Sequence, residues 1–473
     1  MKIQFILFFI SLFFFNCKQK NDSNTKLNSK KPNILLICID DLRPDLNSFG
    51  AKHIISPNID SLAKKGTIFK RHYVNSPSCG PSRYTLLTGV YGSPHNNALF
   101  TRAKKIKDSL SISPSMPEWF KNNGYRTVSV GKVSHHPGGR GGIDWNDSLL
   151  IEMPNAWDKH IVPTGDWQHP RGIMHGLANG EIRKDAKQMD VYQSSKNGNY
   201  PDDLIVDEAI QQMKDLSLNN TPFFLAVGIL KPHLPFGSPS SYYDLYKNTE
   251  FPEIINSENP SFKSTWHNSS EFMQYNTWGK NPNTDLKFAE EVRKHYAACV
   301  SYADAQVGKL MYQLKKLDLY KNTIIVLWGD HGWHLGEHSI WGKHSLFEES
   351  LRSPLLIYNP KSAHSNRVVN QIVETTDIFP TLCDLAEIEI PKFTEGISLK
   401  EVIDKKKSIK KTAFSYTANA KSIRTKDYRL ILHDDGFVEL YNHLTDSLET
   451  KNLAKQEPNI VAKLVSKLKI KGL

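Results

Sequence analysis

The chain has 473 residues, and 60 lysines and arginines against 49 aspartates and glutamates give it a formal net charge of +11 at pH 7. Its hydrophobic content of 39% is ordinary for a globular protein, and its length is enough for one large core and a smaller unit. The positive charges are spread along the chain without a basic-aromatic module, which argues against a nucleic-acid-binding protein.

The first residues have the pattern of an export signal. Lys2 precedes an apolar run that is too short to span a bilayer comfortably as a permanent helix. Cys17 follows at the position where a bacterial lipoprotein carries its lipid, although Phe14-Phe15-Asn16 fits the usual small-residue rule loosely, so soluble secretion stays open. We expect a signal peptide with a lipoprotein cysteine at 1–17 and a polar linker at 18–31.

Five cysteines are too few for a disulfide framework, even in an exported protein. They are Cys17, Cys38, Cys79, Cys299 and Cys383. Cys38 falls inside an apolar run and is expected to be buried in a strand. In an exported setting, the mild positive charge favours a polyanionic sugar as the ligand, because a positive surface raises encounter rates with such a molecule.

Four short apolar runs predict buried strands of a parallel sheet, because they are continuously apolar and do not alternate with polar residues. They span residues 33–39, 126–130, 223–230 and 323–328. Reactive side chains follow each run: Asp40 and Asp41; Lys132, His135 and His136; Lys231 and His233; Asp330 and His331. If the strands are parallel, these side chains meet at one rim, where open parallel sheets bind ligands.

The carboxylates at this rim predict a cation site. Asp40, Asp41 and Asp330 offer hard oxygen ligands, and His331 or a neighbour could complete the shell, which favours Ca²⁺ or Mg²⁺ over a softer metal. The alternative for the aspartate pair is a cap on the next helix.

The stretch that follows His331 is rich enough in histidine to suggest zinc. However, it lacks the His-Glu-x-x-His order and contains Gly332 and Gly336, which make it a poor helix. We therefore expect His334 and His338 to line or brace a loop.

Residues 78–89 predict a short helix with Cys79 at its beginning. Pro81 suits a first helical turn, and Gly89 is a plausible stop. A cysteine at this position faces unpaired backbone N–H groups, with Arg83 one turn away, so an anion is favoured there. The alternative is an ordinary buried cysteine before a helix.

The string Cys79-Gly80-Pro81-Ser82-Arg83 resembles the Cys-X-Pro-Ser-Arg motif of type I sulfatases. The resemblance continues through residues 40–44, 131–135, 231–233 and 330–333, which look like the iduronate-2-sulfatase branch with its bacterial polysaccharide sulfatases. It covers most of residues 32–385 and extends more weakly toward the end of the chain.

This resemblance implies an α/β fold of the alkaline-phosphatase-like sulfatase type, with a large mixed sheet flanked by helices and a small C-terminal antiparallel sheet subdomain. We expect the catalytic domain at 32–387 and the C-terminal subdomain at 388–473. Within the latter, residues 415–442 read as short strands and 458–470 as a closing amphipathic helix. Residues 238–283 are expected to form long loops over the site.

The resemblance also implies a covalent change at Cys79. In that family the cysteine is oxidised to formylglycine (3-oxoalanine), whose hydrate is the nucleophile, and a formylglycine-generating enzyme is the maturation partner. One divalent cation is implied, Ca²⁺ with Mg²⁺ possible. Its ligands would be Asp40, Asp41, residue 79, Asp330 and His331.

The remaining site residues are implied in the same way. Arg83, Lys132 and Lys343 would clamp the sulfate and position the formylglycine. His233 would protonate the departing sugar oxygen, and His135 would take the proton whose removal expels the sulfate. Relatives have one histidine before the Pro-Gly, whereas this chain has two, so His136 stays a candidate for the second role.

The function implied is hydrolysis of sulfate esters in polysaccharides or oligosaccharides, such as uronate- or rhamnose-containing ulvan or glycosaminoglycans. One alternative is a phosphomonoester or phosphonate hydrolase of the same superfold, against which Lys132, His233 and Lys343 argue. Another is a non-catalytic glycan-binding surface protein. The chain is expected in the periplasm or at the cell surface, without nucleic acid, and in contact with a membrane only through a lipid on Cys17.

Overall fold

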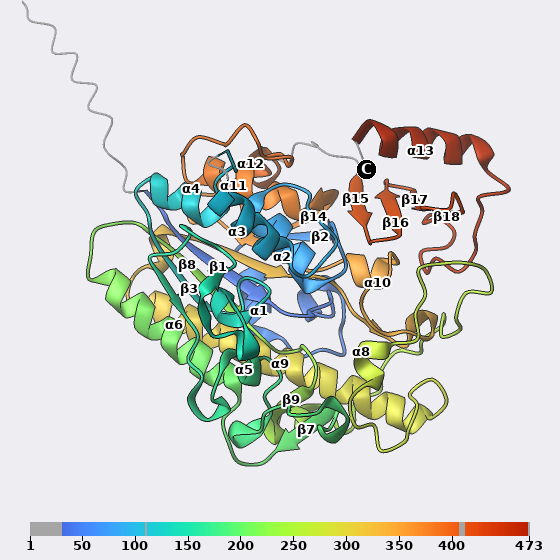
Figure 1. Cartoon of the computed structure of the whole chain (residues 1–473), viewed down its shortest axis with the longest axis horizontal. Helices are drawn as coiled ribbons and strands as arrows, with labels where there is room; N and C mark the ends of the chain where they lie inside the picture. The colour runs from blue at the N-terminus through green and yellow to red at the C-terminus, as the bar shows by residue number, and fades with distance from the viewer. Residues whose placement is uncertain (1–30, 109–110, 406–411, 472–473) are drawn as a thin grey trace, which may run out of the picture.

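The computed structural model describes residues 31–108, 111–405 and 412–471 (Figure 1). The predicted signal peptide, Cys17 and nearly all of the predicted linker lie outside the described residues. Among the described residues, no helix is both long and apolar enough to cross a bilayer.

An eight-stranded mixed sheet runs through the molecule, and its strand order is β14-β2-β13-β10-β1-β8-β3-β6. In that order the strands span Arg367–Glu374, Thr67–Tyr73, Leu355–Tyr358, Thr323–Gly329, Asn33–Ile39, Phe223–Ile229, Arg126–Gly131 and Lys159–Ile161. Strand β13 runs against its two neighbours, and the other pairs are parallel.

The four predicted strands are confirmed as neighbours in the centre of this sheet. Strands β10, β1, β8 and β3 lie side by side and parallel, with Ile37 of β1 opposite Leu327 on one side and Val227 on the other. Every residue of β1, β8 and β10 is buried, which explains their continuously apolar sequences. Their carboxyl ends therefore share one rim.

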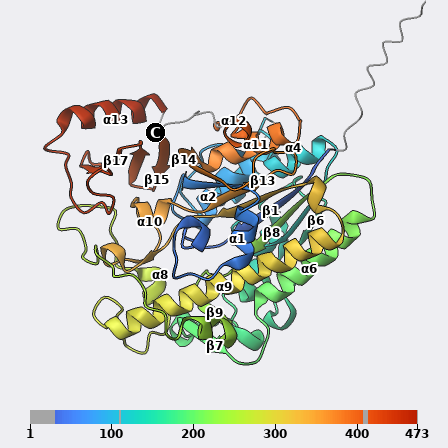
Figure 2. The same ribbon diagram turned by 180° about the vertical axis from the view of Figure 1, so that it is seen from behind.

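Helices cover both faces of the sheet (Figures 1 and 2). On one face pack α1 (Pro57–Ala63), α6 (Pro201–Ser217) and α9 (Leu286–Lys316); on the other lie α2 (Cys79–Thr88), α3 (Ala98–Asp108), α4 (Met116–Asn122), α11 (Ile378–Leu385) and α12 (Lys400–Lys405). Alternate residues of β1 pack against the two helix layers. Leu35 packs with the layer that contains α9, and Leu36 packs with the layer that contains α2. Cys38 is buried in this strand, as predicted.

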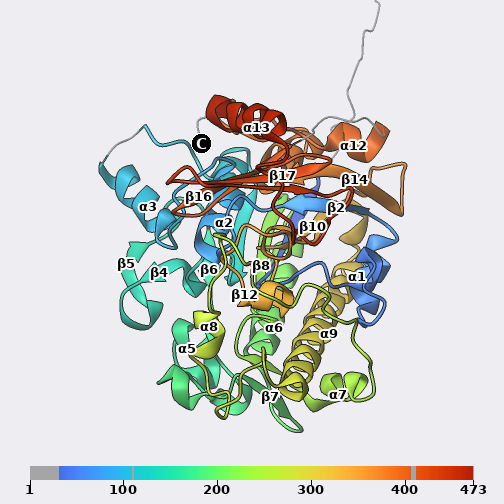
Figure 3. The same cartoon turned by 90° about the vertical axis from the view of Figure 1, so that its right-hand side faces the viewer.

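A smaller antiparallel sheet follows near the C-terminus, which confirms the expected fold. It consists of β15 (Ala413–Tyr416), β16 (Ala420–Arg424), β17 (Tyr428–His433) and β18 (Val438–Asn442). Helix α13 (Pro458–Lys471) packs on it through Leu464 and Leu468 (Figure 3). The small sheet is tied to the loop after β2, because Tyr416 N donates to Asn75 O and Ser415 Oγ donates to Val74 O.

Short elements lie between these layers and around the rim. They are β4 (Arg140–Gly141), β5 (Asp147–Ile151), α5 (Pro170–Met174), β7 (Tyr192–Ser195), β9 (Phe236–Pro239), α7 (Ser240–Tyr243), α8 (Ser270–Met273), β11 (His334–Leu335), β12 (Trp341–Gly342) and α10 (Glu348–Leu351). The predicted long loops at 238–283 are mostly irregular; their regular parts are the last two residues of β9, the short helices α7 and α8 and one 3₁₀ turn.

Candidate functional site

Cys79 is the first residue of α2 and lies at the rim of the large sheet. The helix ends where predicted, with Gly89 in the left-handed conformation. At Gly80 a β-carbon would come within 2.4 Å of Asn96 Cα, so only glycine fits directly after the cysteine. The Cys79 side chain is buried, and its Sγ lies 3.3 Å from His331 Nε2 and 3.3 Å from Lys343 Nζ.

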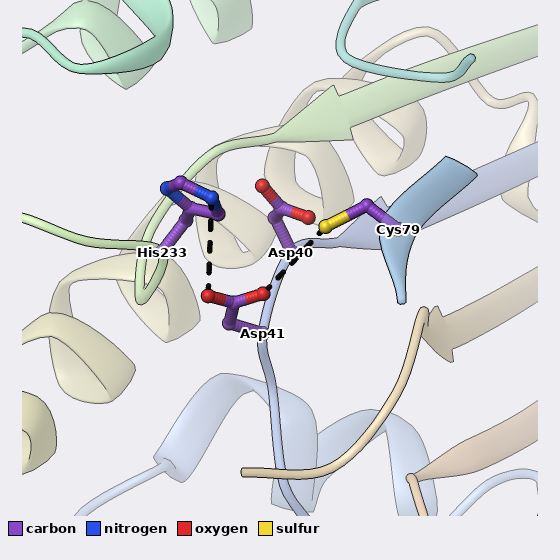
Figure 4. A group of neighbouring side chains, drawn as sticks. All are labelled: Asp40, Asp41, Cys79 and His233. Atoms are coloured by element: carbon purple, nitrogen blue, oxygen red, sulfur yellow. Dashed lines mark hydrogen bonds and ion pairs between the residues drawn. The ribbon is translucent and has the colours of Figure 1, made fainter. Parts of the chain in front are cut away.

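Asp40 and Asp41 follow β1 and point toward Cys79, while His233 lies on the far side of Asp41 (Figure 4). Asp41 has a left-handed backbone, φ 57°, and its carbonyl accepts a hydrogen bond from Tyr296 Oη at 2.8 Å. The carboxylates bind cationic side chains: Asp40 pairs with Arg83 and Lys132, and Asp41 Oδ1 lies 2.9 Å from Lys343 Nζ.

The acidic side chains of the rim form two overlapping groups with the spacing of metal ligands. One contains Asp41, Cys79, Asp330 and His331, and the other Asp40, Asp41, Cys79 and His233; within each group the ligand atoms lie within 4.8 Å of one another. His331 Nδ1 donates to the carbonyl of Gly332 at 2.9 Å, so the free electron pair of Nε2 faces Asp41 Oδ1 at 3.3 Å.

One oxygen of this cluster is unsatisfied. Asp41 Oδ2 is buried and has no hydrogen-bond partner among the described residues. Burial raises the pKa of Asp41 well above its usual range, and the carboxylates of Asp40, Glu271 and Asp330 add to this while Lys343 opposes it. Buried carboxylates of this kind, with a histidine nitrogen beside them, fit a hard divalent cation.

Three buried cations complete the inner site. The Arg83 guanidinium lies 3.0 Å from Asp40 Oδ1 and 3.0 Å from Asp330 Oδ2, so it holds together the ends of β1 and β10. Lys132 comes from the end of β3. Burial would lower the pKa of Lys343, but Asp41, Cys79 and Glu271 hold it well above its usual value, so the side chain is a cation.

His233 is oriented by the backbone around it. The carboxylate of Asp202, in the first turn of α6, accepts hydrogen bonds from Leu230 N at 2.7 Å and Lys231 N at 2.9 Å and so fixes the end of β8. His233 Nδ1 donates to Leu234 O at 2.6 Å. Its Nε2 therefore faces the site, 4.0 Å from Asp41 Oδ2 and 3.8 Å from Glu271 Oε1.

The two neighbouring histidines after β3 have different environments. His136 is paired with Glu152, whose Oε1 lies 2.8 Å from His136 Nδ1. His135 is buried, and burial together with the positive charge of Lys132 lowers its pKa well below the usual range. Its Nδ1 has no hydrogen-bond partner among the described residues. This arrangement favours His135 over His136 for a role at the site.

His334 and His338 brace the loop around β11, as the sequence suggested. His334 Nε2 bonds to Ser345 Oγ at 2.9 Å, and the His338 ring stacks on Phe347. Sequence reasoning missed Glu271, which α8 brings to Lys343 Nζ at 3.2 Å. Its neighbours carry no pattern that would single it out.

Two protein-family models match the chain. The model described as Sulfatase matches residues 32–388, and the model described as N-sulphoglucosamine sulphohydrolase, C-terminal, matches residues 336–471. The first includes the rim, and the second includes the small antiparallel sheet.

Curated relatives agree with the family match. Human iduronate 2-sulfatase is 32% identical over 411 residues, which cover 78% of this chain and 72% of the relative. A sulfatase of Formosa agariphila is 28% identical over 476 residues, covering 96% of this chain and 89% of the relative. An N-acetylglucosamine-6-O-sulfatase of Bacteroides thetaiotaomicron is 25% identical, covering 90% of this chain and 83% of the relative.

Solved structures share the fold at lower identity. One is a protein in complex with its substrate D-glucosamine-2-N,6-O-disulfate, with a TM-score of 0.70 and 21% identity, covering 93% of this chain and 97% of the other. Another is a phosphonate monoester hydrolase of Agrobacterium radiobacter, with a TM-score of 0.73 and 21% identity, covering 93% and 95%. At this identity the likeness concerns the fold.

Proposed function

The chain belongs to the sulfatase family and is a sulfuric ester hydrolase, and from that premise we propose that it removes sulfate from sulfated polysaccharides or oligosaccharides through a formylglycine formed from Cys79. The observation that carries this proposal is the position of Cys79 Sγ, which lies 3.3 Å from both His331 Nε2 and Lys343 Nζ at the beginning of α2. A buried cysteine in ordinary packing would not need carboxylates, a histidine and a lysine around it.

A sulfate monoester resists hydrolysis because its anionic oxygens repel a nucleophile, so the site must neutralise charge, supply a nucleophile and protonate the leaving oxygen. As formylglycine, residue 79 supplies an aldehyde whose hydrate provides the nucleophilic oxygen. Asp40, Asp41, residue 79, Asp330 and His331 would hold a divalent cation, Ca²⁺ before Mg²⁺, which would supply positive charge to stabilise the sulfate and to favour the deprotonated nucleophile.

The cationic side chains have separate tasks in this proposal. Lys343, whose ammonium lies beside residue 79, binds a sulfate oxygen, and Lys132, paired with Asp40, adds positive charge. Arg83 supports both by fixing Asp40 and Asp330. The low exposure of all three side chains strengthens their interaction with a bound anion, because little water screens it.

Two histidines transfer protons. His233 presents Nε2 toward the outer side of the site; because Nδ1 already donates to Leu234 O, only the doubly protonated ring carries a proton on Nε2, and that form would pass it to the departing sugar oxygen. Burial lowers the pKa of His233 well below its usual range, and Asp40 opposes this, so the acid form would depend on the negative charge that the substrate brings. His135, which lies in the electrostatic environment of Lys132 and Arg83, accepts the proton whose removal releases the sulfate. The backbone contacts of His233 support this assignment, because they fix which nitrogen faces the substrate.

The substrate class rests on relatives and on charge. Relatives named as iduronate and N-acetylglucosamine sulfatases act on sulfated sugars, and a net charge of +11 favours an encounter with a polyanion. We therefore propose uronate- or rhamnose-containing glycans, such as glycosaminoglycans or ulvan. The chain would be exported to the periplasm or cell surface, with residues 32–387 as its catalytic domain and 388–473 as its C-terminal subdomain.

A sulfate-release screen tests the proposal. The protein is co-produced with a formylglycine-generating enzyme and incubated with defined sulfated oligosaccharides, an aryl sulfate and an aryl phosphonate monoester. We expect sulfate release from at least one sugar and none from the matched Cys79→Ala protein. Faster turnover of the phosphonate, a reaction suggested by the solved phosphonate hydrolase neighbour, would overturn it. So would sugar binding without turnover by protein that carries formylglycine.

A further inference from the structure

Glu271 stands between the buried site and the solvent. It belongs to α8, in the irregular segment that crosses the rim beside β12 (Figure 3). Its side chain is 26% exposed, whereas those of Lys343 and His233 are 3% and 5% exposed. Glu271 is therefore the most solvent-accessible of these three side chains, and a sugar whose sulfate lies against residue 79 could reach its carboxylate.

The two carboxylate oxygens of Glu271 have different surroundings. Oε1 lies 3.2 Å from Lys343 Nζ and 3.8 Å from His233 Nε2, between the proposed sulfate-binding group and the proposed acid. Oε2 is buried but accepts no hydrogen bond from any described residue. Its nearest charged partner would be His344, whose Nε2 lies 3.4 Å away.

His344 does not satisfy this oxygen. The two atoms lie 3.4 Å apart without the geometry of a hydrogen bond, and the His344 side chain is 42% exposed, so water competes for its ring nitrogens. Lys343 is met by Asp41 Oδ1 at 2.9 Å and by Glu271 Oε1 at 3.2 Å, so its ion pair with Glu271 uses Oε1 and leaves Oε2 without a partner. A buried acceptor without a donor is costly, and native structures reserve such groups for a ligand or water.

We propose that Glu271 is a substrate-binding residue that accepts a hydrogen bond from a sugar hydroxyl next to the cleaved ester. This inference rests on the proposed function and adds a selection rule to it, namely which group next to the cleaved ester the site accepts. Because Lys343 binds the sulfate and His233 meets the ester oxygen, the neighbouring carbon of the sugar ring faces Glu271. A hydroxyl there is a donor, whereas a second sulfate or a carboxylate would be repelled by the like charge.

Kinetics of Glu271→Gln and Glu271→Ala test the proposal. The substrates are the sulfated sugar that the wild-type protein hydrolyses, its analogues deoxygenated at each neighbouring hydroxyl, and an aryl sulfate. We expect kcat/KM on the sugar to fall about 10- to 100-fold, the usual worth of a hydrogen bond to a charged group, with a smaller loss on the aryl sulfate. Glu258→Gln, an exposed carboxylate of the same segment, is the matched control.

A double-mutant cycle separates hydroxyl binding from an effect through a neighbouring side chain. If Glu271 binds a hydroxyl, removing that hydroxyl from the sugar costs the wild-type enzyme as much as Glu271→Ala does, and the two changes together cost little more. Fully additive losses for every hydroxyl overturn the proposal, because they assign the effect to His233. Equal losses on sugar and aryl sulfate also overturn it, because they assign the effect to Lys343.

A vicinally disulfated sugar gives a second readout. The wild-type protein should prefer the monosulfated sugar, and Glu271→Gln should reduce that preference; an unchanged preference contradicts the selection rule. If the proposed function itself is wrong, the outcome is different, because the wild-type protein would then release no sulfate from any sugar.

Discussion

The catalytic rim and the joint between the two sheets are both built from buried carboxylates that face basic side chains. At the joint, which we call the C-terminal ion cluster, α10 meets the small sheet through Glu348, Arg424, Arg429, His443 and Glu449. Arg429 contacts Glu449 at 2.5 Å and Glu348 at 2.6 Å, and His443 Nε2 lies 2.7 Å from Glu449.

The two clusters differ in how completely their charges are paired. Although burial acts against it, Arg429 and His443 lower the pKa of Glu449 to about 2, so this carboxylate is stabilised as an anion. At the rim, burial and three neighbouring carboxylates raise the pKa of Asp41, and its Oδ2 has no hydrogen-bond partner among the described residues. Glu348, His443 and Glu449 also have metal-ligand spacing, but two arginines already neutralise the two carboxylates. Complete pairing indicates a structural joint, and incomplete pairing indicates a ligand site.

The largest expected effect separates function from stability at the rim. Cys79→Ala should remove turnover to the detection limit, because residue 79 carries the proposed nucleophile. The thermal midpoint should stay close to that of the wild type, since alanine fits the beginning of a helix. A clear drop in that midpoint, measured by calorimetry, would show that Cys79 is part of the structural framework.

The next effect concerns His233. Replacing it with alanine should lower the rate on an unactivated sugar sulfate by about 10²–10⁴, the usual worth of a positioned acid. The loss should shrink on an aryl sulfate, whose phenolate leaves without a proton. Lys343→Ala should reduce both rates alike, because Lys343 acts on the sulfate that both substrates share. Equal losses for His233→Ala on the two substrates would assign the acid role to another residue.

The C-terminal ion cluster should respond in the opposite way. Glu449→Ala removes one of the two carboxylates that pair with the buried Arg429, and also the partner of His443; breaking a buried pair typically costs about 3–5 kcal/mol of folding stability, and Glu348, which stays beside Arg429, should keep the loss at the lower end. Activity per folded molecule should remain near that of the wild type. Urea denaturation and active-site titration measure the two quantities, and a loss of kcat without a loss of stability would contradict the distinction between the clusters.

The pH dependence of stability gives a smaller effect. The pKa of Glu449 is lowered from 4.5 to about 2 in the folded chain, so its contribution of about 3 kcal/mol is present above pH 4.5 and is lost as the pH falls toward 2. Glu449→Gln should therefore destabilise the protein more at about pH 7 than at about pH 3. A difference in unfolding free energy that is constant with pH would argue against a depressed pKa.

Local sequence predicted the parts of this site that depend on local patterns. The runs of β1, β3, β8 and β10 are continuously apolar, so their reactive ends were recognisable. Strand β2 was not predicted, because Lys70 and Arg71 interrupt its apolar pattern, although it leads directly to Cys79.

Long-range partners were not predictable from such patterns. Glu271 reaches the rim only through the path of a long irregular segment, and its flanking residues are ordinary. Glu348 and Arg429 are 81 residues apart, and nothing in either local sequence indicates that they form an ion pair. The position of Glu271 and the ion pair between Glu348 and Arg429 both depend on how the loops and the small sheet pack against the large sheet.

The most direct test of the distinction between the rim and the C-terminal ion cluster is Ca²⁺ binding. The protein is first chelated exhaustively, and Ca²⁺ is then added back in a calorimetric titration and a thermal scan. The wild type and Glu449→Gln should each bind one divalent cation per chain and gain thermal stability from it, whereas Asp41→Asn should lose this binding. The account is contradicted if the wild type binds no cation, if Asp41→Asn binds it unchanged, or if Glu449→Gln loses it.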